Sequence, residues 1–251
     1  MLNFIEYGTR SEKPSLLVVH GLFGSARNWS VISKRLSDDR HVVTVDMRNH
    51  GESAWSDRHT YNDLARDLVE IVGKFGGSMD VLGHSMGGKS AMVLALTHPN
   101  LVNRLLVADI APVGYSHTQI PLINAMKSLD LAQIEKRSDA DRLLSDAIPE
   151  PSVRAFLLQS LDVKAKKWRL NLDALAENMD HIIGFPDVRG IYSGPTFFLS
   201  GATSNYVLHE HKPKIRTLFD TPYFAKIPGA GHWLHAEKPR EFEASIRAFF
   251  H

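Results

Sequence analysis

The 251-residue chain contains no cysteine. This absence excludes disulfide bonds, cysteine-ligated metal sites and a thiol nucleophile. The chain also lacks an excess of charge of one sign, because 29 Lys and Arg residues are balanced by 28 Asp and Glu residues. The sequence therefore has no basic surplus for binding nucleic acid and no acidic tail typical of disorder.

Long apolar runs are absent as well. Nowhere do about 18 apolar residues follow one another, so we expect no membrane span. The N-terminus has no basic segment and no apolar stretch of signal-peptide length, and Glu6 interrupts it early. We therefore expect a cytoplasmic protein. The 13 histidines are scattered, and no G-x-G-x-x-G motif follows the first predicted strand, so we expect neither a metal nor another cofactor.

Short apolar runs that end in glycine or a turn alternate with helical patterns. Apolar runs of this kind are typical of buried parallel strands. Helices are predicted from Tyr61 to Phe75, with Thr60 as the cap, from Ser85 to Leu96, and over residues 242–250. The alternation predicts an α/β fold, a mostly parallel sheet with helices on both faces. The predicted strands are Leu16–Val19, Val42–Val45, Val81–Leu82, Leu105–Val107, Thr196–Leu199 and Phe224–Ile227, with Asn3–Tyr7 as a candidate edge strand.

One stretch, from about Val113 to Asp187, interrupts this alternation, because helical segments dominate it and no clear buried strand is present. It is too long for a single crossover, and insertions at the carboxyl ends of parallel strands lie where ligands bind. We predict a core of residues 1–112 and 188–251 with a helical cap, 113–187, the whole being one structural domain. The alternative is a set of ordinary helices packed on the sheet.

The segment Gly83–Gly87 reads Gly-His-Ser-Met-Gly, a G-x-S-x-G motif between a predicted strand and a predicted helix. A serine attacks only if its hydroxyl stands clear of the backbone on a sharp turn, and such a turn needs small residues two positions away. The five-residue pattern alone can arise by chance, but its strand–turn–helix context favours Ser85 as a nucleophile.

A serine nucleophile needs a base, and His232 is the strongest candidate. It lies in the glycine-rich loop Gly229–Trp233, between the last predicted strand and the last helix, and the order of serine first and histidine near the C-terminus is that of α/β-hydrolases. His84 should point away from the site, since side chains alternate along a strand. We expect packing or exposure for His235 and structural hydrogen bonds for His20.

The base needs an acid that holds its tautomer. In this fold the acid usually follows the penultimate strand, but Ser200–Val207 contains no carboxylate and Glu210 lies too far along the chain. Asp109 ends the strand after the nucleophile's own strand and helix, from where a carboxylate can reach an imidazole above Ser85. We therefore predict Asp109 as the acid; its alternative role is a helix cap or Asx-turn before Pro112.

The tetrahedral intermediate of acyl transfer needs two hydrogen-bond donors at its oxyanion. One should be the N–H of Met86, directly after the nucleophile. The other should come from the loop after the first core strand, where we favour the N–H of Leu22, with Phe23 as the alternative. The side chains of Leu22, Phe23, Met86 and Trp233 should line the substrate pocket; packing in the core is their alternative role.

Taken together, these motifs resemble the YbfF-type esterases, bacterial α/β-hydrolases related to a mitochondrial abhydrolase branch. The resemblance implies the α/β-hydrolase fold with a cap inserted after the sixth strand, and a Ser–Asp–His triad that matches Ser85, Asp109 and His232. It also implies esterase activity, with acyl-CoA thioesters among the possible substrates. The segments that carry it are His20–Ser25, Asp46–Gly51, Gly83–Lys89, Asp109–Val113, Trp168–Asn171 and Gly229–Pro239.

The resemblance also suggests that basic residues beside Trp168 meet a CoA phosphate, although such a run is more often a solvated turn. These residues are Lys164, Lys166, Lys167 and Arg169.

The sequence thus predicts a serine hydrolase that cuts a small-molecule ester or acyl thioester through an acyl-enzyme, without a cofactor. Two other functions stay open. One is a non-hydrolytic small-molecule receptor on the same fold, which could have lost His232 or the acid. The other is a cofactor-free perhydrolase or carbon–carbon bond hydrolase, which would use the same triad. The sequence carries no signal for the oligomeric state or the acyl length.

Overall fold

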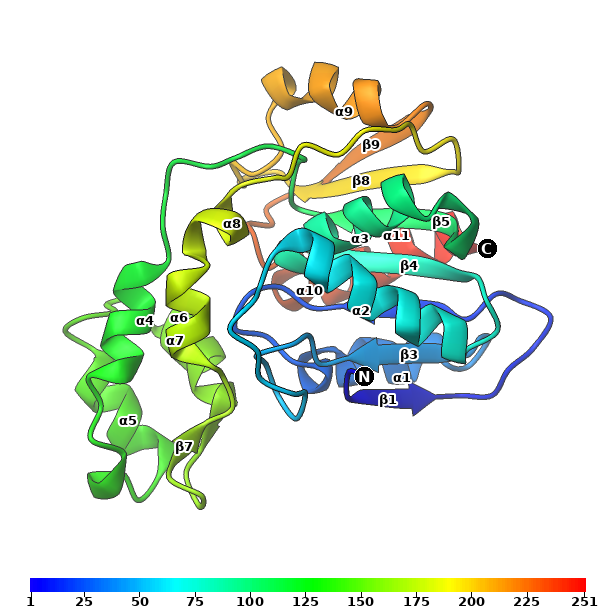
Figure 1. The fold of residues 1–251 in the computed structure, drawn as a ribbon. Coiled ribbons are helices and arrows are strands. Elements are labelled where there is room, and N and C mark those ends of the chain that lie inside the picture. Colours follow the sequence, from blue (N-terminus) through cyan, green and yellow to red (C-terminus); the bar gives the residue numbers. More distant parts are fainter.

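The computed structural model describes all 251 residues. Seven strands form one sheet in the order β1-β3-β2-β4-β5-β8-β9 (Figure 1). Every neighbouring pair is parallel except β1 and β3. The predicted edge strand is therefore confirmed, and it is antiparallel. The strands are β1 (Phe4–Tyr7), β2 (Leu16–Val19), β3 (Val42–Val45), β4 (Met79–His84), β5 (Val102–Ala108), β8 (Thr196–Gly201) and β9 (Pro222–Ile227).

The predicted strands are confirmed, but β4 and β5 are longer than their apolar runs. The extra residues include charged side chains that the sheet buries in pairs. Asp80 of β4 is fully buried and accepts hydrogen bonds from Arg40 and Arg104, at 3.0 and 2.7 Å. Because a buried charge is tolerated when it is paired, an apolar pattern underestimates the length of these strands.

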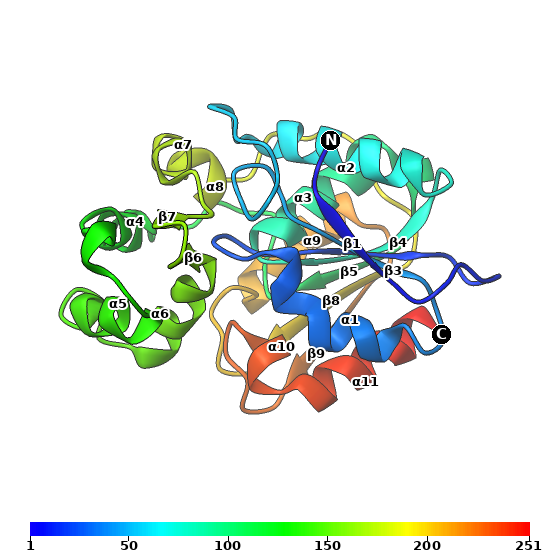
Figure 2. The ribbon, with the colours of Figure 1, turned by 90° about the horizontal axis from the view of Figure 1, so that it is seen from below.

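Helices cover both faces of the sheet, and alternate strand residues face each side. Leu16 and Val18 pack with α1, α10 and α11, whereas Leu17 and Val19 pack with α2 and α3. Figure 2 shows α1 and α11 on one side of the strands and α2 on the other. The core helices are α1 (Ser30–Leu36), α2 (Tyr61–Lys74), α3 (Met86–Thr97), α9 (Lys212–Leu218), α10 (Leu234–Glu237) and α11 (Pro239–Phe250), with 3₁₀ helices η1 (Ala26–Trp29), η2 (Pro99–Leu101) and η5 (His209–His211).

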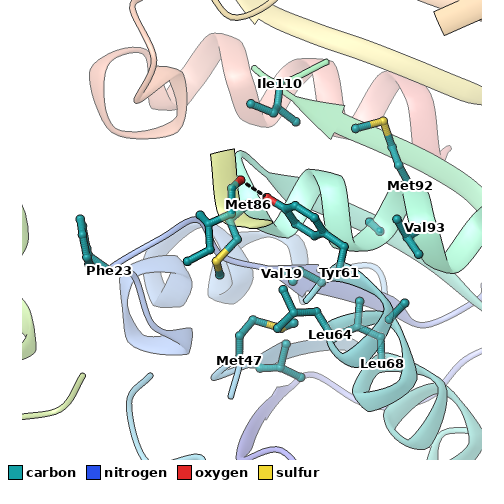
Figure 3. Packing of buried hydrophobic residues seen from close by; sticks show 14 of the residues in the cluster. Val19, Phe23, Met47, Tyr61, Leu64, Leu68, Met86, Met92, Val93 and Ile110 are labelled. Carbon is teal, nitrogen blue, oxygen red and sulfur yellow. Dashed lines mark hydrogen bonds between the residues drawn. The ribbon is translucent and has the colours of Figure 1, made fainter. Parts of the chain in front are cut away.

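Helix α3 begins directly after Ser85 and is the most deeply buried helix of the core. Its first eleven residues, 86–96, are all buried. Helix α2 packs over it, and Figure 3 shows Leu64 and Leu68 of α2 in the same apolar cluster as Met92 and Val93 of α3. The predicted cap of α2 is confirmed, because the Thr60 hydroxyl accepts a hydrogen bond from an N–H in the first turn.

Residues 113–187 form an inserted segment of short helices, which lie together beside one end of the sheet (Figure 1). The segment follows β5, the fifth strand, and not the sixth as expected. The expected count was one strand too high, because the chain has only one strand, β1, before β2. It also contains a two-stranded ribbon, β6 and β7, whose strands are too short to give an alternating pattern. Its elements are α4 (Ile120–Lys127), η3 (Leu131–Gln133), α5 (Arg137–Leu144), α6 (Pro151–Leu157), η4 (Leu158–Ser160), β6 (Leu161–Asp162), β7 (Lys167–Trp168), α7 (Leu172–Glu177) and α8 (Met179–Ile183).

No helix of the structure, in the core or in the inserted segment, is both long enough and apolar enough to cross a bilayer.

Candidate active site

The serine of the G-x-S-x-G motif stands on the sharp turn between β4 and α3. Ser85 has φ 52° and ψ −121°, a backbone conformation that side-chain-bearing residues rarely adopt. A Cβ atom at Gly83 would overlap the carbonyl group of Gly87, and one at Gly87 would overlap the carbonyl oxygens of Val19 and His20. The turn is therefore so tight that both positions need glycine, as the sequence argument required.

The structure brings the three side chains of the predicted triad together. The Nε2 atom of His232 lies 3.1 Å from the Oγ atom of Ser85, and its Nδ1 atom lies 2.7 Å from the Oδ2 atom of Asp109. An Nδ1–H that donates to the carboxylate leaves the lone pair on Nε2, where it can accept the hydroxyl proton of the serine. The arrangement can therefore activate a nucleophile.

Asp109 is fully buried, and its carboxylate accepts two further hydrogen bonds. The N–H of Gly201 donates to Oδ1 at 3.0 Å, and the hydroxyl of Ser204 donates to Oδ2 at 2.5 Å. Ser204 belongs to the loop after β8, where an acid was sought and not found. The role of Ser204 was not predicted from the sequence, because nothing in the local pattern indicates that a hydroxyl there would meet the carboxylate that follows β5.

Only one of the two candidate amides of the loop after β2 is free. The N–H of Phe23 donates to the Nε2 atom of His50 at 3.1 Å, whereas the N–H of Leu22 has no acceptor in the protein. Met86 is the first residue of α3, so its N–H has no carbonyl one turn earlier in the helix. This geometry favours Leu22 over Phe23 as the partner of Met86.

A cleft between the core and the inserted segment surrounds these groups. Its empty volume is about 860 Å³, a figure that includes space open to the solvent. Fifteen of its 26 lining residues are hydrophobic, and Leu22, Phe23, Met86 and Trp233 are among them. The inserted segment contributes further apolar side chains, and the ring of Phe156 lies 5.4 Å from that of Trp233.

Two aromatic rings not foreseen from the sequence hold His232 in place. The Tyr206 ring stacks on the imidazole with centroids 4.0 Å apart. His84, expected to point away from the site, has its ring 4.9 Å from that of His232, and its Nε2 atom bonds to the carbonyl oxygen of His232 at 2.9 Å. The expectation for His84 was wrong because β4 ends there and the chain turns at Ser85.

A buried lysine joins the nucleophile's helix to the end of the inserted segment. The ammonium group of Lys89, one turn after Ser85, donates to the carbonyl oxygens of Ile183 and Gly184 at 2.8 and 2.5 Å. Burial lowers the pKa of Lys89 to about 7. The hydroxyl of Tyr61 donates to the preceding carbonyl, of Ile182, at 2.7 Å. Core side chains thus fix the point where the inserted segment returns to the sheet.

The basic run beside Trp168 lies at the β6–β7 ribbon, and part of it is engaged within the protein. Arg169 bonds to Glu52 and to Asp162, and Lys166 donates to the carbonyl oxygen of Ile134. These contacts leave fewer of the basic groups free for a phosphate than the sequence suggests.

Several buried histidines should make the fold sensitive to acid. Burial lowers the pKa of His59 and His235 to about 3, and it also lowers the pKa of His20, His50 and His84. In the unfolded chain these groups take up a proton near pH 6.5, whereas in the folded protein they stay neutral. Stability is therefore lost as the pH falls from 6.5 toward the folded values.

One pH unit below 6.5, each such histidine should cost up to about 1.4 kcal/mol of folding free energy. Urea unfolding at about pH 7 and about pH 5.5 measures this cost directly. His235→Phe should lose less stability between the two pH values than the unmodified protein. Equal unfolding free energies at both pH values would contradict the assignment of neutral buried imidazoles.

Comparisons with known proteins agree with this fold. Residues 16–245 match the model of a family described as the alpha/beta hydrolase family. The chain is 42% identical over 248 residues to the sn-1-specific diacylglycerol lipase ABHD11 of Mus musculus, covering 94% of this chain and 80% of that protein. It is 34% identical over 239 residues to esterase YbfF of Escherichia coli strain K12, covering 93% and 92%. A solved structure described as a marine microorganism esterase superposes with a TM-score of 0.93 at 35% identity, covering 99% and 98%.

Proposed function

Because this chain belongs to the alpha/beta hydrolase family and is a carboxylic ester hydrolase, we propose that it cuts esters or acyl thioesters through an acyl-enzyme formed on Ser85. The observation that carries the proposal is the pair of contacts made by His232, 3.1 Å to the hydroxyl of Ser85 and 2.7 Å to the carboxylate of Asp109. Each contact has the length that proton transfer and tautomer control require.

In the first half-reaction, Ser85 Oγ attacks the acyl carbon while His232 Nε2 takes the hydroxyl proton. The carbonyl oxygen becomes an oxyanion, to which the N–H groups of Leu22 and Met86 donate. The intermediate collapses, the alcohol or thiol leaves with the proton from His232, and the acyl group stays on the serine. In the second half-reaction, His232 activates a water that releases the acid and restores the hydroxyl.

Asp109 acts on this cycle through the imidazole. Its carboxylate holds the Nδ1–H of His232 and stabilises the imidazolium that forms when the serine proton is taken. The donors from Gly201 and Ser204 keep the carboxylate oriented, because they engage both of its oxygens. Asp109 itself stays unprotonated during the reaction.

The inserted segment 113–187 is proposed as a cap that closes the cleft over the acyl chain, with 1–112 and 188–251 as the catalytic core. Side chains of the cap face the apolar wall that Leu22, Phe23, Met86 and Trp233 provide. An apolar cleft of this kind suits fatty acyl groups. Relatives named diacylglycerol lipases make a glycerolipid one candidate substrate, and acyl-CoA is another.

We also propose that the protein is located in the cytoplasm, which cell fractionation tests.

The two alternatives predict different chemistry. A non-hydrolytic receptor needs no nucleophile that reacts, so it would not form an adduct with a fluorophosphonate. A perhydrolase would use hydrogen peroxide in place of water, and a carbon–carbon bond hydrolase would turn over diketones rather than esters. The ester and lipase names of the relatives favour ester hydrolysis over both.

A graded series of substrates should show the chemistry and the acyl preference together. We expect kcat/KM for p-nitrophenyl esters to rise from acetate to a medium-length acyl chain, because each buried CH₂ group contributes about 0.8 kcal/mol. Acyl-CoA thioesters of the same lengths, followed with a thiol reagent, compare ester with thioester. Ser85→Ala supplies the background rate, and a folded protein that hydrolyses none of these substrates would contradict the proposal.

A further inference from the structure

Both backbone polar groups of Phe23 are held by side chains from other parts of the molecule. Its N–H donates to the Nε2 atom of His50 at 3.1 Å, and its carbonyl oxygen accepts a hydrogen bond from the hydroxyl of Ser160 at 3.0 Å. His50 lies in the loop after β3, in the core, whereas Ser160 ends η4, in the cap. Phe23 directly follows Leu22, whose N–H is the free amide of this loop.

His50 is built to accept that hydrogen bond. It is fully buried, and its Nδ1–H donates to the carbonyl oxygen of Arg48 at 2.9 Å, so the lone pair is on Nε2. Burial lowers the pKa of His50 well below its usual value, which keeps the ring neutral. His20 makes a parallel contact, with its Nε2 atom accepting the N–H of Met47 at 2.9 Å.

The two contacts decide which amide of the loop faces the nucleophile. An N–H of Phe23 that points to His50 is not available to an oxyanion, which leaves the N–H of Leu22. Phe23 also has φ 63°, a left-handed conformation that is strained for a bulky residue and persists only where the surroundings impose it. His50 and Ser160 are the surroundings that hold the polar groups of Phe23.

The cap segment that carries Ser160 is docked on the loop that carries His50. His50 and Leu170 form an isolated antiparallel bridge, and the N–H of Gly51 donates to the carbonyl oxygen of Arg169 at 2.8 Å. The N–H of Arg169 in turn donates to the carbonyl oxygen of Ser160 at 2.8 Å. The loop after β3, which carries His50, the cap segment from Ser160 to Leu170 and the loop after β2, which carries Phe23 and is called the oxyanion loop below, therefore form one hydrogen-bonded unit.

We propose that His50 and Ser160 are positioning residues that clamp Phe23 and thereby aim the N–H of Leu22 at the oxyanion. Through Ser160, the cap contributes to stabilising the transition state and not only to binding the acyl chain. This inference rests on the proposed function, because it assumes an oxyanion that forms when Ser85 attacks.

Replacing either residue should lower kcat and leave KM nearly unchanged, since an oxyanion contact is made in the transition state and not with bound substrate. For His50→Leu we expect kcat to fall about 10- to 100-fold, less than the roughly 10²- to 10³-fold cost of removing one oxyanion donor, because the N–H of Leu22 is misdirected and not removed. Ser160→Ala should lower kcat in the same way by a smaller factor. His50→Gln, whose amide oxygen can still accept the N–H of Phe23, should recover part of the loss.

His41→Leu is the matched control, because His41 is an equally buried histidine at the opposite end of β3. Its ring bonds to Ser15 and Glu6 and touches nothing in the oxyanion loop, so kcat should match that of the unmodified protein. Circular dichroism and thermal unfolding of every variant separate loss of fold from loss of rate. If His50→Leu does not fold, Ser160→Ala carries the test alone, because it removes a single hydroxyl.

Unchanged kcat in folded His50→Leu and Ser160→Ala, or a rise in KM alone, would overturn the clamp. Such a result would leave the proposed function standing, provided that Ser85→Ala is inactive in the same assay. Full activity of Ser85→Ala would instead refute the proposed function, whatever the clamp variants do.

Discussion

Ser85→Ala should lower kcat for ester hydrolysis on the order of 10⁶-fold. Alanine removes the only atom that can carry the acyl group, and the oxyanion donors that remain cannot replace a nucleophile. The fold should persist, because the side chain of Ser85 bonds only to His232 and a methyl group fits the same backbone conformation. Release of p-nitrophenol by the purified variant is the measurement.

Circular dichroism and the thermal midpoint show whether the Ser85→Ala protein is folded. Binding of an uncleaved long-chain ester, followed by quenching of tryptophan fluorescence, shows whether its cleft is intact, since Trp29 and Trp233 line that cleft. A folded variant with near-normal turnover would mean that another group attacks the ester.

Asp109→Asn should lower kcat about 10⁴-fold while the protein stays folded. An amide that donates to Nδ1 of His232 leaves the ring proton on Nε2, and that nitrogen can then no longer accept the proton of Ser85. The replacement keeps the volume of the buried side chain and an oxygen for the N–H of Gly201. The hydroxyl of Ser204, which shares the Oδ2 position with His232, can turn to accept a hydrogen bond from the new amide. Steady-state kinetics with a short-chain p-nitrophenyl ester measure the loss.

Asp109→Ala is the control for the tautomer effect, because it removes the carboxylate without offering an amide donor. We expect that variant to be slow as well, because no group then holds the tautomer of His232 or stabilises its imidazolium. Ser204→Ala keeps the acid and should cost less than either substitution. An Asp109→Asn enzyme that works at the wild-type rate would place the acid elsewhere.

Much of this site follows from local patterns in the sequence. The tight turn around Ser85 is encoded by Gly83 and Gly87, whose missing side chains make room for backbone carbonyl groups, that of Gly87 and those of Val19 and His20 respectively. The glycine-rich loop points to His232. The absence of any carboxylate in Ser200–Val207 turns attention to Asp109, which the structure places 2.7 Å from the imidazole.

The contacts that the sequence did not predict join residues far apart in the chain. Ser204 meets Asp109 across 95 positions, and Lys89 meets Ile183 across 94. Periodicity and turn signals describe only neighbouring residues, so they contain no information about such pairs. The orientation of His84 also escaped prediction, because strand alternation holds only while the strand continues.

The inserted segment 113–187 shows a second limit of prediction from sequence, which concerns the bounds of short helices. Its helical character was evident from the sequence, but the bounds of its helices were not. Helix α6 begins at Pro151 and ends at Leu157, and α7 ends at Glu177, just before α8 begins. Helices of only five to eight residues have few turns on which an apolar face can repeat. Their bounds are therefore set by packing against the core and by caps, such as the carboxylate of Glu150 at the start of α6.

The central claim is that Ser85 forms a covalent bond to the acyl group during turnover. Peptide mass spectrometry after reaction with a fluorophosphonate tests it most directly. The account predicts one adduct, on the peptide that contains Ser85, at a rate that falls in Asp109→Asn. An enzyme that hydrolyses esters yet carries the adduct on another residue, such as Ser204, or carries none, would contradict it.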